Sequence, residues 1–169
     1  NFRLFIILTS ILIPTHAGTC RYSLRSGQYH CDLEFAHELL EDSQLEIQGN
    51  HLNGYNDEDV KVVTIRLSVI HYFKSAIFDK FKGIEELNTF DIEMFEIKPN
   101  AFSSCSELQL IYIEDEDLNT LPSRVFENCL KLREVTIRNQ LVTIPSDAFY
   151  KAQSIELLDL SINRLEVFP

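Results

Sequence analysis

Three groups of residues in this chain have types that could do chemistry: histidines, a run of acids and four cysteines. The segment HELLE, His37–Glu41, lacks only the second histidine of HExxH, in which two histidines hold zinc and the glutamate acts as a base. Because that second ligand is missing, we interpret the segment as structural. The other histidines have no ligand spacing, and the sequence contains no nucleophile elbow, phosphate-binding loop or paired-cysteine zinc motif. We therefore expect no enzyme, no metal site and no cofactor.

The run of acids, Glu114–Asp117, lies between two apolar stretches. Calcium loops take oxygen ligands at alternating positions and need a glycine for their sharp turn, and no such glycine follows this run. Two interpretations are preferred to calcium: a solvated acidic edge, or an acidic patch that faces a partner.

The charge balance argues against one class of partner. The 169 residues include 26 Asp and Glu against 15 Lys and Arg, which gives a formal net charge of -11. Binding to nucleic acid needs clustered Lys and Arg that replace the counterions of the phosphates. We expect no nucleic-acid partner.

The first 17 residues have the pattern of a secretory signal peptide. Arg3 precedes the apolar run Leu4–Ile13, and Thr15 and Ala17 occupy the small-residue positions of a cleavage site. The run is too short to span a bilayer, which takes roughly 20 residues. We assign residues 1–17 to a signal peptide and predict a secreted or extracellular protein.

Apolar residues recur with a fixed period over the last two thirds of the chain. Segments of one pattern begin at spacings of 24, 24, 24 and 23 residues, at Val60, Ile84, Leu108, Leu132 and Ile155. Apolar positions three and five residues later share one face of a strand. A phenylalanine column follows at Phe78, Phe102, Phe126 and Phe149. A fixed period of this kind indicates a solenoid whose coils stack on one another.

The pattern that these offsets spell, LxxLxLxxNxLxxLPxxxFxxLxx, resembles the extracellular leucine-rich repeat family, including the repeats of Toll-like receptors and secreted arthropod immune proteins. The resemblance covers residues 60–169 in about five repeats, the last of them truncated. It implies an α/β fold: a right-handed leucine-rich repeat solenoid, or horseshoe, with a concave parallel β-sheet, short helices or turns on the convex side and an N-terminal disulfide cap.

One position of the repeat, the asparagine of the pattern, departs from the family. Asparagine, whose amide binds backbone groups of neighbouring coils, matches cleanly only at Asn163. The earlier coils carry instead Ser68, Ile92, Glu116 and either Asn139 or Gln140. We expect irregular backbone around the second and third coils.

Residues 18–59 are not a full repeat, and we predict that they form the N-terminal capping region. Cys20 and Cys31 flank the turn signal Ser26-Gly27, so we expect a hairpin closed by a Cys20–Cys31 disulfide. Closing so short a loop stabilises by roughly 3 kcal/mol if the effect is entropic. At its other end the chain stops in mid-coil, which suggests a fragment, and membrane association would need a further C-terminal segment.

The other two cysteines, Cys105 and Cys129, lie one coil apart in an inward column that also contains Phe81 and Ala152. Adjacent coils are about 5 Å apart, which is within reach of a disulfide. Packing alone also explains a small apolar residue in this column. Both states stay open, and we favour two free buried thiols.

Residues between the inward strand positions project from the concave sheet in columns. Aromatic and arginine side chains dominate the energetics of protein interfaces, and several lie in these columns. The predicted ligand-binding residues are Arg66, Asn88, Phe90, Leu110, Tyr112, Glu114, Thr136, Arg138 and Asp159.

We hypothesise an extracellular recognition module that binds a protein ligand or receptor on its concave surface. The resemblance to Toll-like repeats suggests a role in immune recognition or receptor signalling, by analogy of fold. The alternative is a structural leucine-rich repeat protein that assembles into a homo-oligomer and has no dedicated ligand.

Overall fold

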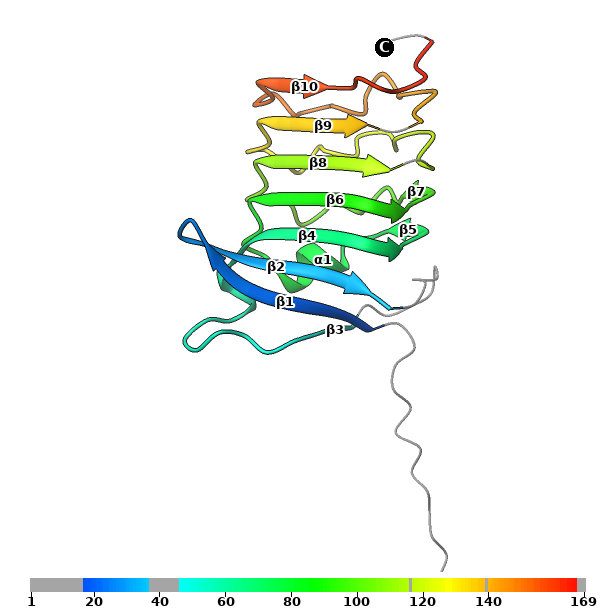
Figure 1. Cartoon of the computed structure of the whole chain (residues 1–169). Helices are drawn as coiled ribbons and strands as arrows, with labels where there is room; N and C mark the ends of the chain where they lie inside the picture. Colours follow the sequence, from blue (N-terminus) through cyan, green and yellow to red (C-terminus); the bar gives the residue numbers. More distant parts are fainter. Residues whose placement is uncertain (1–16, 37–45, 116, 139, 167–169) are drawn as a thin grey trace, which may run out of the picture.

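The protein is a solenoid built on one sheet of eight strands (Figure 1). The computed structural model describes residues 17–36, 46–115, 117–138 and 140–166. In chain order the elements are β1 (Ala17–Arg25), β2 (Gln28–Phe35), β3 (Glu46–Gln48), the 3-10 helix η1 (Asp57–Asp59), β4 (Val60–Val69), β5 (Tyr72–Phe73), α1 (Ala76–Lys80), β6 (Glu86–Glu93), β7 (Glu96–Ile97), β8 (Leu110–Asp115), β9 (Glu134–Arg138) and β10 (Leu157–Asp159). The large sheet has the order β10-β9-β8-β6-β4-β2-β1-β3, and β5 pairs with β7 in a small second sheet.

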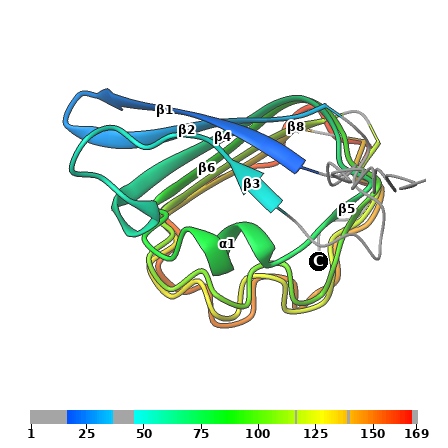
Figure 2. The same cartoon turned by 90° about the horizontal axis from the view of Figure 1, so that it is seen from below.

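Five strands, β4, β6, β8, β9 and β10, lie parallel and in the register that the repeat predicts. The inward residues three positions into each coil are direct partners, in the column Val63, Leu87, Ile111, Val135 and Leu158. The chain therefore winds once around the core between each strand and the next, which confirms the leucine-rich repeat solenoid. Turns fill most of the convex side, where α1 is the one α-helix among the described residues (Figure 2).

The phenylalanine column lies in the core, between the sheet and the convex turns. Ring centroids are 5.4 Å apart between Phe78 and Phe102, and 5.2 Å apart between Phe102 and Phe126. The column ends with Phe149, whose centroid lies 5.6 Å from that of Phe126. The first three rings are buried and Phe149 is partly buried. Phe102 and Phe126 therefore pack on the rings of the coils on both sides, and the two end rings pack on one neighbour each.

Cys105 and Cys129 form a disulfide between the second and third coils. The preference for free thiols is therefore wrong. Their Cα atoms are 5.0 Å apart, because the stacking of coils puts the two residues side by side in one inward column. Both side chains are buried, so the bond lies inside the core. It links two coils that are already in contact.

β1 and β2 form an antiparallel hairpin with the predicted turn. Arg25 pairs with Gln28, which leaves Ser26 and Gly27 as a two-residue loop. These two residues have φ of 51° and 81°. Two-residue hairpin loops favour such left-handed backbone because its twist matches that of the strands, and glycine adopts it without strain.

The hairpin continues the main sheet at its N-terminal end. β2 pairs in parallel with β4, and β1 pairs with β3, which is the edge strand. Cys20 is bonded to Cys31 across the hairpin, and the rings of Tyr22 and Tyr29 stack at 5.6 Å. The sheet therefore ends on a hairpin with side-chain links of its own. That residues 18–59 act as a cap stays a prediction.

Asparagine performs the expected role in the last coil. The side-chain amide of Asn163 donates to the carbonyls of Ile137 and Leu160 at 2.7 and 2.8 Å. Its oxygen accepts from the N–H of Leu141 at 3.1 Å. One side chain thus ties the bend of its own coil to the backbone of the coil before it.

In the first two coils, the position that holds asparagine in the family pattern carries another residue, and strand pairing continues to that position. Ser68 and Ile92 pair directly, so β4 and β6 are longer than β9 and β10. The register between β6 and β8 then shifts between Thr89 and Ile92. This shift confirms the prediction of irregular backbone at the second and third coils.

Some predictions fall outside the described residues. They concern the signal peptide up to residue 16, the HELLE segment, Glu116 and Asn139 in the asparagine slot, and the end of the chain at Pro169. Of the helices that are described, none is long and apolar enough to cross a membrane.

Truncation of one ring tests the column. Phe102→Ala is expected to lower the free energy of unfolding by about 3–5 kcal/mol, because the ring is buried and the cavity is closed on both sides by neighbouring coils. Phe95→Ala is the matched control, since Phe95 is 48% exposed. Urea denaturation followed by circular dichroism measures both variants. Equal losses for the two would contradict the packing role of the column.

Candidate functional site

The predicted ligand-binding residues lie on the face of the sheet that points away from the core, which we call the concave face. The strand ladder aligns them across the coils in the order expected, for example in the column Thr64, Asn88, Tyr112, Thr136 and Asp159. The next column along the strands places Arg66 beside Phe90 and Glu114 beside Arg138. The structure thus brings the predicted residues together, and their role in binding stays a prediction.

Four of these residues, Arg66, Phe90, Tyr112 and Arg138, form a continuous stack across four coils, which we call the concave stack. The guanidinium carbon of Arg66 lies 4.3 Å from the centroid of the Phe90 ring. The Phe90 and Tyr112 centroids are 5.0 Å apart. On the far side, the guanidinium carbon of Arg138 lies 5.9 Å from the Tyr112 centroid. Cation–π contacts at exposed sites contribute about 0.5–1 kcal/mol each, so the stack orders these side chains.

Carboxylates hold the second half of the concave stack. The phenol of Tyr112 donates to Glu114 at 2.6 Å, and this bond raises the pKa of Tyr112. Arg138 donates to Asp159 at 2.7 Å, and the pKa of Arg138 rises because Asp159 accepts that bond. Hydrogen bonds from Ser161, followed by the bond from Arg138, lower the pKa of Asp159 to about 2. Tyr112 and Arg138 therefore each have a neighbour in the concave stack on one side and a carboxylate partner on the other.

The other predicted residues lie around the concave stack. Asn88 donates to the carboxylate of Glu86 at 2.7 Å. Leu110 lines a hollow of about 240 Å³ at the start of β6, β8 and β9, which we call the rim hollow. Thr136 is half-buried between Tyr112 and Asp159 in its column. The face thus combines an ordered aromatic centre with a polar depression at one edge.

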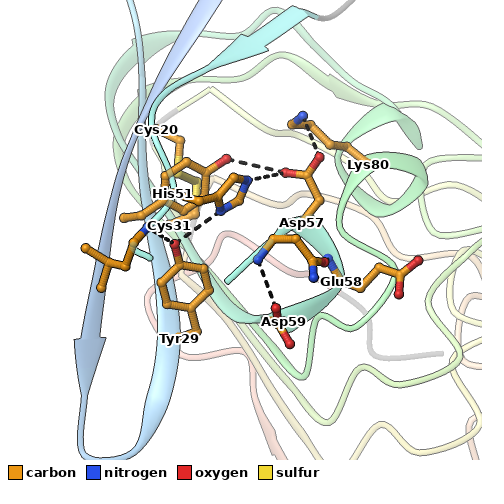
Figure 3. A network of polar contacts seen from close by, with 11 residues as sticks. Cys20, Tyr29, Cys31, His51, Asp57, Glu58, Asp59 and Lys80 are labelled. Atoms are coloured by element: carbon orange, nitrogen blue, oxygen red, sulfur yellow. Dashed lines mark hydrogen bonds and ion pairs between the residues drawn. A yellow bond between two sulfur atoms is a disulfide. The ribbon is translucent and has the colours of Figure 1, made fainter. Parts of the chain in front are cut away.

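A second polar cluster joins the hairpin to the first coil (Figure 3). The hydroxyl of Tyr29 accepts from the N–H of Leu52 at 3.0 Å and lies 3.1 Å from Nδ1 of His51. Nε2 of His51 lies 3.0 Å from Asp57. Lys80, on α1, donates to the other oxygen of Asp57 at 3.0 Å. The chain of contacts therefore runs from β2 through the loop to the convex helix.

Both ring nitrogens of His51 have a polar partner in this cluster: the Tyr29 hydroxyl for Nδ1 and the Asp57 carboxylate for Nε2. Because a carboxylate oxygen only accepts, Nε2 donates to Asp57. The ring of Tyr22 stacks on His51 at 3.9 Å, and burial, followed by the charge of Asp57, raises the pKa of Tyr22. Since each of these groups has a partner within the cluster, the arrangement holds the hairpin on the first coil.

No sequence motif predicted this cluster. Its bonded pairs are 22, 6 and 23 residues apart, and no motif links them. One local signal was present: Asn56 precedes three acids and forms a capping box, in which its side chain accepts from Glu58 and its N–H donates to Asp59. That signal predicts the helical turn that carries Asp57, but not its partners.

The described residues contain no group of three or more His, Cys, Asp or Glu that could hold a metal ion. The geometry offers a surface for contact and a cluster of structural hydrogen bonds.

The Arg138–Asp159 pair has a measurable signature. Arg138→Gln is expected to raise the pKa of Asp159 above about 2. The pKa should stay below the ordinary value of about 3.9, because the larger cause, the bonds from Ser161, remains. Folding lowers the pKa of Asp159, so its ionised carboxylate stabilises the fold when the pH is above the pKa of the unfolded chain. This contribution is lost as the pH falls through the folded pKa of about 2. NMR titration of the carboxyl carbon gives the pKa.

The control for this titration is Arg124→Gln, which removes the guanidinium that lies 3.4 Å from Asp147 in another coil. It should leave the pKa of Asp159 unchanged. A pKa of Asp159 that does not respond to Arg138→Gln would show that the ion pair does not form in solution.

Comparison with known proteins gives the family. The profile described as BspA type Leucine rich repeat region matches residues 47–164 in 6 copies. No curated protein matches the chain. The match supports a leucine-rich repeat protein, and the finer resemblance to Toll-like or arthropod secreted repeats stays a prediction. Since the matched residues are more than half of the chain, the protein belongs to the BspA-type leucine-rich repeat family.

Proposed function

We propose that the protein is an extracellular recognition module that binds a protein ligand on its concave face. Leucine-rich repeats indicate a protein–protein interaction module. The observation that carries the finer proposal is the concave stack, in which two aromatic rings lie in contact between two arginines. Aromatic and arginine side chains supply most of the binding energy in protein interfaces.

The concave stack also lowers the entropic cost of binding. Phe90 and Tyr112 are half-buried and already in contact, and Tyr112 is bonded to Glu114. Immobilising a flexible side chain at an interface costs about 0.5–1.5 kcal/mol. Side chains that are ordered before binding avoid much of that cost, so this part of the sheet favours contact with a partner.

Two features support an extracellular setting. The N-terminal 17 residues have the pattern of a signal peptide. All four cysteines are in disulfides, which persist in oxidising compartments. A role in immune recognition or receptor signalling is the specific form that the resemblance to Toll-like repeats suggests.

The binding proposal is tested with peptides selected from a phage-displayed random library on the immobilised protein. The double variant Phe90→Ala/Tyr112→Ala is expected to bind them at least about tenfold more weakly, because it removes both rings of the concave stack. Tyr150→Ala is the matched control: Tyr150 is 46% exposed and lies 4.7 Å from the guanidinium carbon of Arg124, in a coil turn outside the sheet. Equal affinities for the double variant and the wild type would refute the concave face as the binding surface.

The second candidate is self-assembly through the edge of the sheet. Leu158 is 37% exposed on the edge strand β10, although its partner Val135 is fully buried, and Leu157 is 48% exposed. An apolar strand edge of this kind can pair with a second copy.

Sedimentation separates the two candidates. We expect a monomer across a concentration series, because a recognition module needs no self-contact. A mass that grows with concentration, and that Leu158→Glu returns to the monomer value, would favour the structural role.

A further inference from the structure

We infer that the partner segment on the concave face is basic, and that one of its lysine or arginine side chains enters the rim hollow. This inference rests on the proposed function and adds the chemistry of the partner. Three features support a basic partner: the shape of the concave face, the pairing of its charges and the charge of the whole chain.

The rim hollow lies where β6, β8 and β9 begin, at the left end of these strands in Figure 1. Its volume is about 240 Å³, which accepts one long side chain rather than a whole ligand. The lining consists of one apolar and six polar or charged residues: Gln28, Glu85, Glu86, Gln109, Leu110, Arg133 and Glu134. Leu110 provides a surface for the alkyl stem of a lysine or arginine, whose charged end can then meet the carboxylates.

The cations at the rim hollow are already paired. Lys61 lies 3.1 Å from Glu85, and Arg133 lies 3.9 Å from Glu156. Two carboxylates that line the hollow have no cation as a partner within the described residues. Glu86 accepts only from the neutral amide of Asn88 at 2.7 Å, and the exposed Glu134 forms no ion pair or side-chain hydrogen bond there. The rim hollow therefore carries an excess of negative charge that an incoming cation would neutralise.

The charge of the whole chain acts in the same direction. With a net charge of -11, the protein attracts basic partners and repels acidic ones before contact. Three of the four residues of the concave stack lie on the strands that border the rim hollow, and Leu110 and Tyr112 both belong to β8 and project from the same face. A basic residue in the hollow thus leaves the next residues of an extended segment beside Tyr112.

The arginines of the concave stack do not reverse this preference. Arg138 is bonded to Asp159 at 2.7 Å and is neutralised by it. Arg66 lies on the ring of Phe90 and has no ion pair among the residues that the structure describes. It is a single cation, and an acidic partner would have to reach it against the charge of the whole chain. Acidic ligands are therefore the outcome that would overturn the inference.

The test uses the peptides selected on the wild-type protein. We expect these peptides to be enriched in lysine or arginine and to lose affinity in 1 M salt, where the Debye length is about 3 Å. The double variant Glu86→Gln/Glu134→Gln keeps the shape of both side chains and removes their charge. It is expected to bind the selected peptides about tenfold more weakly. Peptides enriched in aspartate or glutamate would overturn the inference.

Matched variants separate the rim hollow from general attraction. Glu127→Gln/Glu166→Gln makes the same change in net charge at positions outside the sheet and should alter affinity far less. Equal losses for the two double variants would mean long-range attraction only, and the rim hollow would be excluded as the site. If Phe90→Ala/Tyr112→Ala abolishes binding while Glu86→Gln/Glu134→Gln does not, the proposed function stands and this inference fails. If neither variant changes the affinity, both fail.

Discussion

The whole structure depends on the packing of each coil on the next through its inward side chains, and above all on the phenylalanine column. A single coil has too little apolar surface to bury its own residues, so it acquires a core only between neighbours. The rings of Phe78, Phe102, Phe126 and Phe149 follow one another at 5.2–5.6 Å, close to the spacing of the strands opposite them. Strand pairing and ring stacking thus impose the same repeat distance on the two sides of the core.

That constraint also creates the concave face. Once inward residues are locked in register, the residues between them must project from the other side of the sheet in columns whose successive members are about 4.8 Å apart. Side chains one coil apart are then close enough to interact directly, and the concave stack from Arg66 to Arg138 is the result. The surface that we propose for binding is therefore built by the same ladder that forms the core.

The two ends of the described sheet differ in how their side chains are covered. At the N-terminal end a hairpin extends the sheet, and a chain of hydrogen bonds through Tyr29, His51 and Asp57 ties it to Lys80 in the first coil. At β10 the inward Leu158 remains partly exposed, although its counterparts in earlier coils are buried. The exposed part of Leu158 is the observation on which the second candidate function, self-assembly, rests.

The sequence by itself determined the period, the inward columns, the strand register and the set of residues on the concave face, because these depend only on the alternation of side chains along strands that repeat every 23 or 24 residues. Tertiary structure alone decided which neighbours interact. It joined Cys105 to Cys129, where the sequence allowed both states and we favoured free thiols, and it brought His51 to Asp57 and Tyr29 from separate segments. The physical reason is that a repeat pattern fixes where a side chain lies, whereas bonds between particular atoms depend on loop paths and side-chain rotamers that have no period.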